Sequence, residues 1–128
     1  MFEIFRRSLR IRFKQKGSLT SGITLGDAQQ PGMRLNNKDD YFLSDIHPNV
    51  GDTIFLQMSW HRYPDMTYQV PLASFDGRLD LESLARRVAR SCAHYFQNNR
   101  IAVSWDRLEL KYLEELEYGV WQPVLSTF

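Results

Sequence analysis

The chain has 128 residues, of which 43% are hydrophobic and 13% aromatic, so it is long enough to form one domain with its own core. No apolar run approaches the ~18 to 20 residues that span a bilayer, and the single cysteine, Cys92, excludes an internal disulfide. The net charge of +1 conceals an asymmetry, because residues 1–16 carry six basic residues and one acid, whereas the rest of the chain is acidic.

The basic arm at residues 1–16 has an alternating second half. Leu9, Ile11 and Phe13 alternate with basic residues, which favours a strand over residues 8–14. Several apolar residues of the arm also share one helical face, so a helix stays an alternative. The arm also has the Arg-rich, acid-poor composition of a mitochondrial presequence, which makes import a minor alternative to a cytoplasmic or nuclear, intracellular location.

Residues 17–40 are rich in Gly, Ser, Thr, Asn and Asp and hold few large apolar side chains. Such a stretch buries too little surface to offset the entropy lost on ordering. We therefore expect a flexible linker or a long loop here, followed by a globular domain over residues 41–128.

Two alternating segments open this domain. Alternate positions are apolar in both: Ile54, Leu56, Met58 and Trp60 in the first, and Met66, Tyr68, Val70 and Leu72 in the second. Between them Pro64 suits the first corner of a turn, so residues 53–72 are predicted to form a hairpin. Pro71 has no amide hydrogen to donate, and the second strand should therefore end there or lie at an edge of a sheet.

A helix is predicted over residues 80–97. Asp80 is a suitable N-cap, and the acidic Glu82 in the first turn is favoured by the helix dipole. The apolar positions recur at helical spacing: Leu81, Leu84, Ala85, Val88, Cys92, Tyr95 and Phe96.

The last third alternates like a strand, although its Glu and Leu residues favour a helix by propensity. Only Leu113 and Glu114 break the alternation over residues 108–120, so strand structure is predicted for residues 107–125. No turn-forming residue lies near Leu113, and the pattern allows either one long strand with a bulge there or two strands joined by a poor turn. The same parity places Tyr118 in the core and Trp121 at the surface.

These elements predict an α+β fold, with an antiparallel or mixed sheet and one main helix packed on one face. Their order, ββαββ, is that of a β-grasp domain. A leading strand at residues 8–14 would make a ferredoxin-like fold the alternative.

The sequence holds no constellation typical of an enzyme or of a metal or cofactor site. His47, His61 and His94 lack the spacing of a ligand set. Cys92 lies on the apolar face of the predicted helix, with no base placed beside it. The N-terminal glycines are spaced too widely for a phosphate-binding loop. We therefore expect neither catalysis, nor a metal, nor a cofactor.

Three segments resemble small uncharacterised proteins of mushroom-forming fungi: HPNVGDTIFLQMSW at 47–60, LARRVARSCAHYF at 84–96 and WDRLELKYLEELEYGVWQP at 105–123. The resemblance covers about the last 80 residues. It implies a family without an assigned activity, so it transfers no functional residues to this chain.

Two functions compete on this pattern. The first is a non-catalytic protein-interaction module, whose exposed sheet edge, or whose surface at Trp121 and Tyr63, binds a protein partner or a second copy as a homodimer. The second is binding to nucleic acid or another anionic surface through basic side chains of the arm and the helix. These are Arg6, Arg7, Arg10, Arg12, Lys14, Lys16, Arg86, Arg87 and Arg90.

Overall fold

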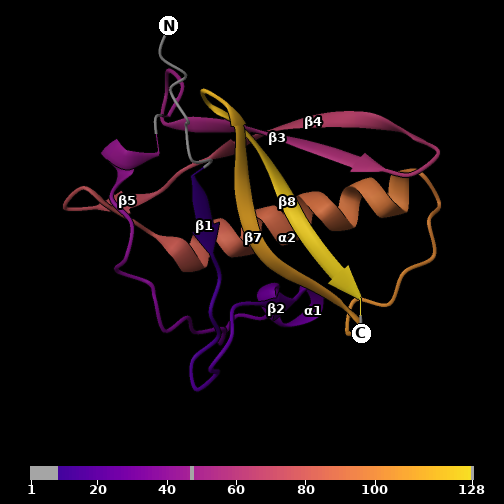
Figure 1. The fold of residues 1–128 in the computed structure, drawn as a ribbon, viewed down its shortest axis with the longest axis horizontal. Helices are drawn as coiled ribbons and strands as arrows, with labels where there is room; N and C mark the ends of the chain where they lie inside the picture. The colour runs from indigo at the N-terminus through magenta and orange to yellow at the C-terminus, as the bar shows by residue number, and fades with distance from the viewer. Residues whose placement is uncertain (1–8, 47, 128) are drawn as a thin grey trace, which may run out of the picture.

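The computed structural model describes residues 9–46 and 48–127. One mixed sheet has the strand order β1-β7-β8-β3-β4, and the long helix α2 (Leu81–Asn98) lies across one of its faces (Figure 1). The strands of this path are β1 (Arg10–Arg12), β3 (Thr53–Trp60), β4 (Tyr63–Pro71), β7 (Leu108–Glu117) and β8 (Val120–Thr127). The smaller elements are β2 (Ile23–Thr24), which also pairs with β7, α1 (Leu25–Ala28), the 3-10 helix η1 (Leu43–Asp45), β5 (Ser74–Phe75) and β6 (Arg78–Leu79).

The predicted α+β class and ββαββ order are confirmed. The hairpin β3–β4, the helix α2 and the hairpin β7–β8 follow one another, and the short ribbon β5–β6 lies between β4 and α2. The two hairpins meet where β8 runs parallel to β3, through the pairs Phe55↔Val120 and Leu56↔Trp121. A leading strand also exists, since β1 pairs antiparallel with β7. The second long helix that a ferredoxin-like fold requires is not among the described elements.

The helix forms as its sequence predicts. A carboxylate oxygen of Asp80 accepts a hydrogen bond from the backbone N–H of Ser83 at 3.0 Å, which caps the first turn. Every apolar position predicted to face the sheet is buried, including Leu84, Val88 and Phe96. This face closes the hydrophobic core against the strands.

The C-terminal segment is a hairpin whose turn lies at Tyr118-Gly119, beyond the place where the sequence suggested a break. Gly119 has φ +76°, a conformation that glycine adopts without steric cost. β7 runs through Leu113 without interruption. Its register with β8 shifts instead around Lys111 and around Leu116, where β7 holds one residue more than its partner.

The turn at Tyr118-Gly119 overturns the predicted positions of two aromatic residues. Each extra residue of β7 reverses which face of the sheet the following side chains point to, so the two bulges together cancel. The two-residue turn makes the reversal that remains, because Glu117 stands opposite Val120, three positions later, and the two share a face. Trp121, predicted at the surface, is 0% exposed and belongs to the core. Tyr118, predicted in the core, is 60% exposed. Both predictions were wrong because strict alternation was carried through the turn: Tyr118 lies in the turn itself, and Trp121 follows it on the core face of β8.

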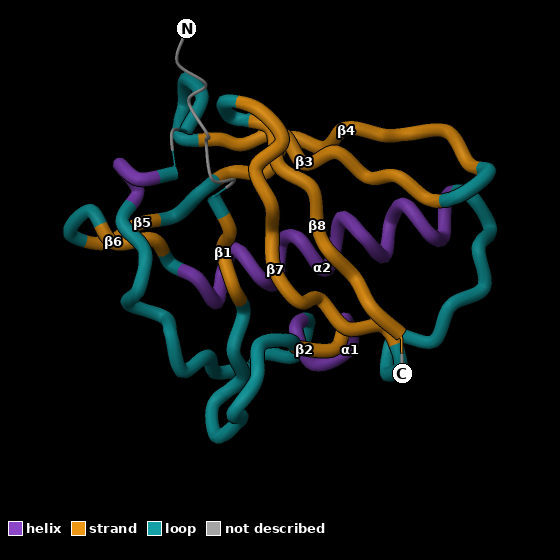
Figure 2. Tube along the Cα trace, in the orientation of Figure 1, coloured by secondary structure: helices purple, strands orange, loops and turns teal. Residues whose placement is uncertain are grey.

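Residues 17–40 are packed on the rest of the domain, and their loops run beside and below α2 (Figure 2). Ile23 of β2 pairs with Leu110 of β7, and the core includes Leu25, Met33 and Leu35. The N–H of Leu35 donates to a carboxylate oxygen of Glu82 at 2.8 Å, tying this segment to the start of α2. This packing favours the long loop over the flexible linker.

Candidate protein-interaction edge

The sheet ends at two very different edges. On one side lie the three-residue β1 and the two-residue β2, both paired with β7. On the other side lies the nine-residue β4, which pairs with β3 and with no other described strand (Figure 1). An edge strand presents a row of backbone donors and acceptors to solvent. The long edge at β4 is therefore the first candidate for a binding site.

The register shows which backbone groups β4 presents outward. The N–H of Phe55 in β3 donates to Gly119 at 2.9 Å, on the side away from β4. Antiparallel pairs alternate between residues that bond to each other and residues that bond away from each other. Gln69, which stands opposite Phe55, must then turn its own N–H and C=O away from β3, and so must Thr67 two residues earlier.

At both ends of this edge, backbone groups are either missing or already hydrogen-bonded to α2. Pro71 has no N–H, and its carbonyl oxygen accepts a hydrogen bond from Arg87 Nη1 at 2.7 Å. At the other end the register of β4 is irregular beyond Met66, and the carbonyl oxygen of Pro64 accepts from the hydroxyl of Tyr95 at 2.8 Å. The open stretch therefore covers residues 65–70. The prediction that the strand ends at Pro71 or lies at an edge is confirmed in both senses.

The side chains along the edge divide between the two faces of the sheet. On the helix side the hydroxyl of half-buried Tyr68 lies 2.7 Å from His94 Nδ1, and the two rings meet edge to face. Burial raises the pKa of the Tyr68 hydroxyl, so it stays neutral at physiological pH. On the other face Thr67 and Gln69 are exposed, and Asp65 accepts from the side chain of Gln57 at 3.3 Å. The middle of the edge thus carries no charge.

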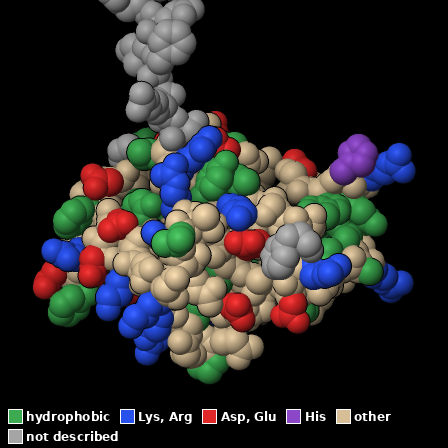
Figure 3. Space-filling view, turned by 60° about the horizontal axis from the view of Figure 1, so that its bottom comes forward, with side chains coloured by type: hydrophobic (Ala, Val, Ile, Leu, Met, Phe, Trp, Pro, Cys, Tyr) green, Lys and Arg blue, Asp and Glu red, His purple; other side chains and the backbone are tan. Residues whose placement is uncertain are grey.

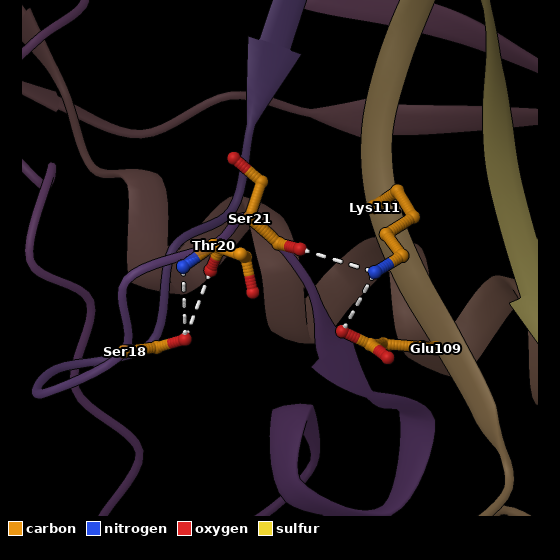
Figure 4. A network of polar contacts seen from close by, with 5 residues as sticks. All are labelled: Ser18, Thr20, Ser21, Glu109 and Lys111. Carbon is orange, nitrogen blue, oxygen red and sulfur yellow. Dashed lines mark hydrogen bonds and ion pairs between the residues drawn. The ribbon is translucent and has the colours of Figure 1, made fainter. Parts of the chain in front are cut away.

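At the other edge of the sheet, β7 is bonded to the segment around Ser21 and Gly22 that covers it. Lys111 Nζ of β7 donates to the carbonyl oxygen of Ser21 at 3.3 Å and forms an ion pair with Glu109 at 3.3 Å (Figure 4). Gly22 has φ +133°, and a side chain there would collide with Glu109. Close packing on β7 therefore fixes this segment beside the short edge.

The two predicted partner-binding residues, Tyr63 and Trp121, differ in exposure. Tyr63, at the start of β4, is 40% exposed, so its ring is accessible. Trp121 is enclosed in the core and offers no ring to a partner. Nothing in the sequence marks Thr67 and Gln69, because their importance lies in the direction of their backbone groups and not in side-chain chemistry.

The basic residues proposed to bind anions do not converge. Arg6 and Arg7 lie outside the described residues. Arg10 forms an ion pair with Glu114 at 3.7 Å, and its guanidinium lies 4.7 Å from the centre of the Tyr112 ring. The helix arginines Arg86, Arg87 and Arg90 lie on α2, where Arg87 contacts the β4 edge.

The strand order separates these two groups. Four strand spacings lie between β1 and β4, which corresponds to roughly 19 Å. On the face that Figure 3 shows, basic and acidic side chains are interspersed and form no single-sign patch. Lys14 and Lys16 lie just after β1, on the arm side of this separation. Anion binding through the combined set stays a prediction.

Cys92 is a core residue without accessible chemistry. Its side chain is fully buried, and its sulfur lies 3.7 Å from the sulfur of Met58. Desolvation raises the pKa of the thiol to about 12, so the nucleophilic thiolate is absent at neutral pH. Within residues 9–46 and 48–127, no cluster of His, Cys, Asp and Glu residues could hold a metal ion.

The sheet also opens where its two hairpins diverge. The β3–β8 ladder ends at Leu56↔Trp121, and residues 57–60 and 122–125 line a hollow of about 280 Å³ just beyond it. Trp60 also borders a second hollow of about 480 Å³, whose wall includes Val103 and Leu108. Neither hollow contains a charged cluster that would point to a substrate.

Comparison with known proteins agrees with the coarse prediction of an uncharacterised family. None of the curated proteins and none of the solved structures matches the chain. No helix of the described part is long and apolar enough to cross a membrane. One family model, described as "Domain of unknown function (DUF6741)", matches residues 2–127. The match spans the basic arm as well as the sheet and the helix, and the chain belongs to this family.

Proposed function

We propose that this protein is a non-catalytic interaction module that recruits an extended strand of a partner at the open edge of β4. The observation that carries the proposal is the outward direction of the N–H and C=O groups of Thr67 and Gln69 at the end of the sheet. An added strand satisfies such groups with main-chain hydrogen bonds. The closed ends at Pro64 and Pro71 give the added strand a defined position.

The energetics set a condition on the partner. Thr67 and Gln69 supply two donors and two acceptors, and each net hydrogen bond contributes ~1 kcal/mol. A total of about 4 kcal/mol corresponds to a dissociation constant in the millimolar range. The partner must therefore also bury apolar surface, and half-buried Met66 and Tyr68 on the helix side of β4 are suitable contacts.

An intracellular location, cytoplasmic or nuclear, and a fungal origin remain part of this proposal. The free thiol of Cys92 is compatible with a reducing compartment.

A strand-forming peptide without charge tests the edge directly. The probe is an acetylated and amidated Thr-Val-Thr-Val-Thr-Val hexapeptide, titrated against the isotope-labelled protein. We expect the amide resonances of Thr67 and Gln69 to shift most, and that of Tyr68, which faces β3, to shift least.

Two variants separate edge pairing from general contact. Thr67→Pro removes an outward N–H that β3 does not use, so the fold should persist while peptide binding is lost. Gln69→Ala keeps the backbone donor and should bind. Gln69→Pro gives a second test if Thr67→Pro does not fold. A peptide that shifts neither Thr67 nor Gln69, or that binds both proline variants as tightly as the unmodified chain, would refute the proposal.

A further inference from the structure

We infer that the strand recruited by β4 is the β4 strand of a second copy of the chain, paired antiparallel about a two-fold axis at Tyr68. This inference depends on the proposed function, since it names the partner of the same edge. It follows from the alternation of outward-bonding residues along β4, from the two closed ends of the edge, and from the charged side chains of Asp65 and Arg87 near these ends.

Along β4, residues whose backbone groups point outward alternate with residues that bond to β3, and this alternation restricts the possible registers. Outward-facing residues must stand opposite outward-facing residues for their backbone groups to bond. With the axis at Tyr68, Thr67 of each copy stands opposite Gln69 of the other, which gives four hydrogen bonds from regular strand. An axis at Thr67 would place Gln69 opposite Asp65, where the register of β4 with β3 is irregular. The Tyr68 axis therefore uses both regular outward residues and leaves the irregular part unpaired.

Charge complementarity supports the same register. It places Asp65 of one copy opposite Pro71 of the other, where no backbone N–H is available. Arg87 already lies there, with Nη1 donating to the carbonyl oxygen of Pro71 at 2.7 Å. The Asp65 side chain starts on the face opposite α2, where it now accepts from Gln57. The Arg87 guanidinium, however, lies at the level of the strand backbone, because it binds the Pro71 carbonyl oxygen. Its remaining N–H donors can therefore bind the carboxylate of Asp65 from the second copy at the rim of the sheet, in place of the bond to Gln57. Symmetry repeats this pair at the other end, and no two like charges meet in the paired strands.

The apolar contacts also match in this register. Tyr68 stands opposite Tyr68 of the second copy at a pair that is not hydrogen-bonded, where Cα atoms approach to about 4.5 Å and side chains are closest. Met66 stands opposite Val70. Cross-strand aromatic pairs contribute ~0.2 to 1 kcal/mol, and the hydrogen bond to His94 orients the Tyr68 ring beforehand. The helix side of the edge thus supplies the apolar burial that the hydrogen bonds alone lack.

Mixed cysteine variants test the register in the full chain. Thr67→Cys and Gln69→Cys are prepared separately, with different tags, and then mixed under mild oxidation. Hydrogen-bonded cross-strand pairs hold Cα atoms about 5.5 Å apart, which is within the range for a disulfide. We expect a cross-linked heterodimer in the mixture and much less cross-linking of either variant alone. Cys92 is fully buried, so the unmodified chain should not cross-link.

Charge reversal tests the Asp65–Arg87 pairs. Asp65→Arg and Arg87→Asp should each weaken self-association in sedimentation velocity by roughly tenfold, and the double variant should recover most of it. Arg12→Asp makes the same charge change on β1, at the opposite end of the sheet, and should leave association unchanged.

The outcomes distinguish the two proposals. If the hexapeptide binds at β4 but the chain stays monomeric at millimolar concentration, the recruiting edge stands and the second copy is not its partner. Cross-linking that is as efficient with Thr67→Cys alone would overturn the Tyr68 axis. A double charge variant that associates no better than the single variants would overturn the ion pairs. If the hexapeptide fails as well, both proposals fall.

Discussion

The two edges of this sheet differ in length, charge and cover. β1 is three residues long, two of them arginines, and the chain that follows it is fastened to β7 through Lys111 and Gly22. β4 is nine residues long, carries no charge over its middle, and has only its two ends closed. Short strands, charged residues and covering loops are the usual protection against edge-to-edge pairing. The first edge has that protection, whereas the second is open over residues 65–70.

The two edges of this sheet therefore have different roles, one in stability and the other in the proposed association. The segment from β1 to η1 completes the core on one side and stabilises the fold. β4 contributes Val70 to the same core but directs the backbone groups of Thr67 and Gln69 outward. Variants on the covered side should therefore change stability, and outward-facing variants on β4 should change association with little loss of stability.

The largest effect is expected where the two halves of the sheet join. Trp121 lies on β8 opposite Leu56 of β3, and its side chain is fully buried. Trp121→Ala should lower the free energy of unfolding by ~3 to 5 kcal/mol, because it leaves a large cavity between the hairpins. Chemical denaturation measures this loss. The control is Phe75→Ala, at an 80% exposed ring, which should stay within about 0.5 kcal/mol of the unmodified chain. Equal losses would place the core elsewhere.

The next effect comes from Cys92, beneath β3. Its pKa rises from an ordinary 9.0 to about 12 in the folded protein, so this contribution to stability is fully present below pH 9 and is lost as the pH rises toward 12. Relative to Cys92→Ala, the chain should lose ~2 kcal/mol of unfolding free energy between pH 8 and pH 10.5. Denaturation curves at both pH values measure the difference. An identical pH dependence in the two proteins would show that the thiol is accessible to water.

A moderate effect tests the covered side. Glu82→Ala removes the acceptor for the N–H of Leu35 and leaves that group without its partner, which should cost ~1 to 3 kcal/mol. Glu82→Gln keeps an acceptor and should cost less. Hydrogen exchange over residues 33–35 should accelerate in the alanine variant. Unchanged exchange would mean that this contact does not hold the segment on α2.

The smallest effect concerns the charges of the short edge. Arg10 and Glu114 form an ion pair at 3.7 Å with 43% and 25% of their side chains exposed. Arg10→Ala should cost ~0.2 to 1 kcal/mol at low salt, and most of this difference should disappear in 1 M NaCl. A larger, salt-independent loss would instead indicate that the arginine acts mainly through its packing on Tyr112.

The sequence was most informative where one periodicity runs without interruption. Helix α2, its Asp80 cap and the hairpin ending at Pro71 could be predicted because each depends on neighbouring residues. The turn of that hairpin lies at His61-Arg62, however, and the predicted turn residue Pro64 lies inside β4. The face of Trp121 could not be predicted, because it depends on the position of the turn together with the bulges at Lys111 and Leu116, and these bulges arise from pairing with β8 and leave no local signal. The burial of Leu25 and Leu35 was hidden because isolated apolar residues in a polar segment show no period.

The candidate site was predictable only in outline. An exposed sheet edge was expected from the strand-rich pattern with its long C-terminal segment, and Pro71 indicated that the second strand ends there or lies at an edge. The closure of that edge by Arg87 depends on a contact between residues 16 positions apart in the chain, on different elements. The outward direction of Thr67 and Gln69 depends on the bond between Phe55 and Gly119, which are 64 positions apart. Neither contact leaves a pattern in the sequence.

Amide hydrogen exchange at residues 67–69 tests the central claim most directly. In dilute protein the N–H groups of Thr67 and Gln69 should exchange quickly, whereas that of Tyr68, bonded to β3, should be protected. Raising the protein concentration, or adding the hexapeptide, should slow exchange at Thr67 and Gln69 and leave Tyr68 unchanged. If the exchange rates of the Thr67 and Gln69 N–H groups are the same in dilute protein, in concentrated protein and with the hexapeptide, β4 does not recruit a strand.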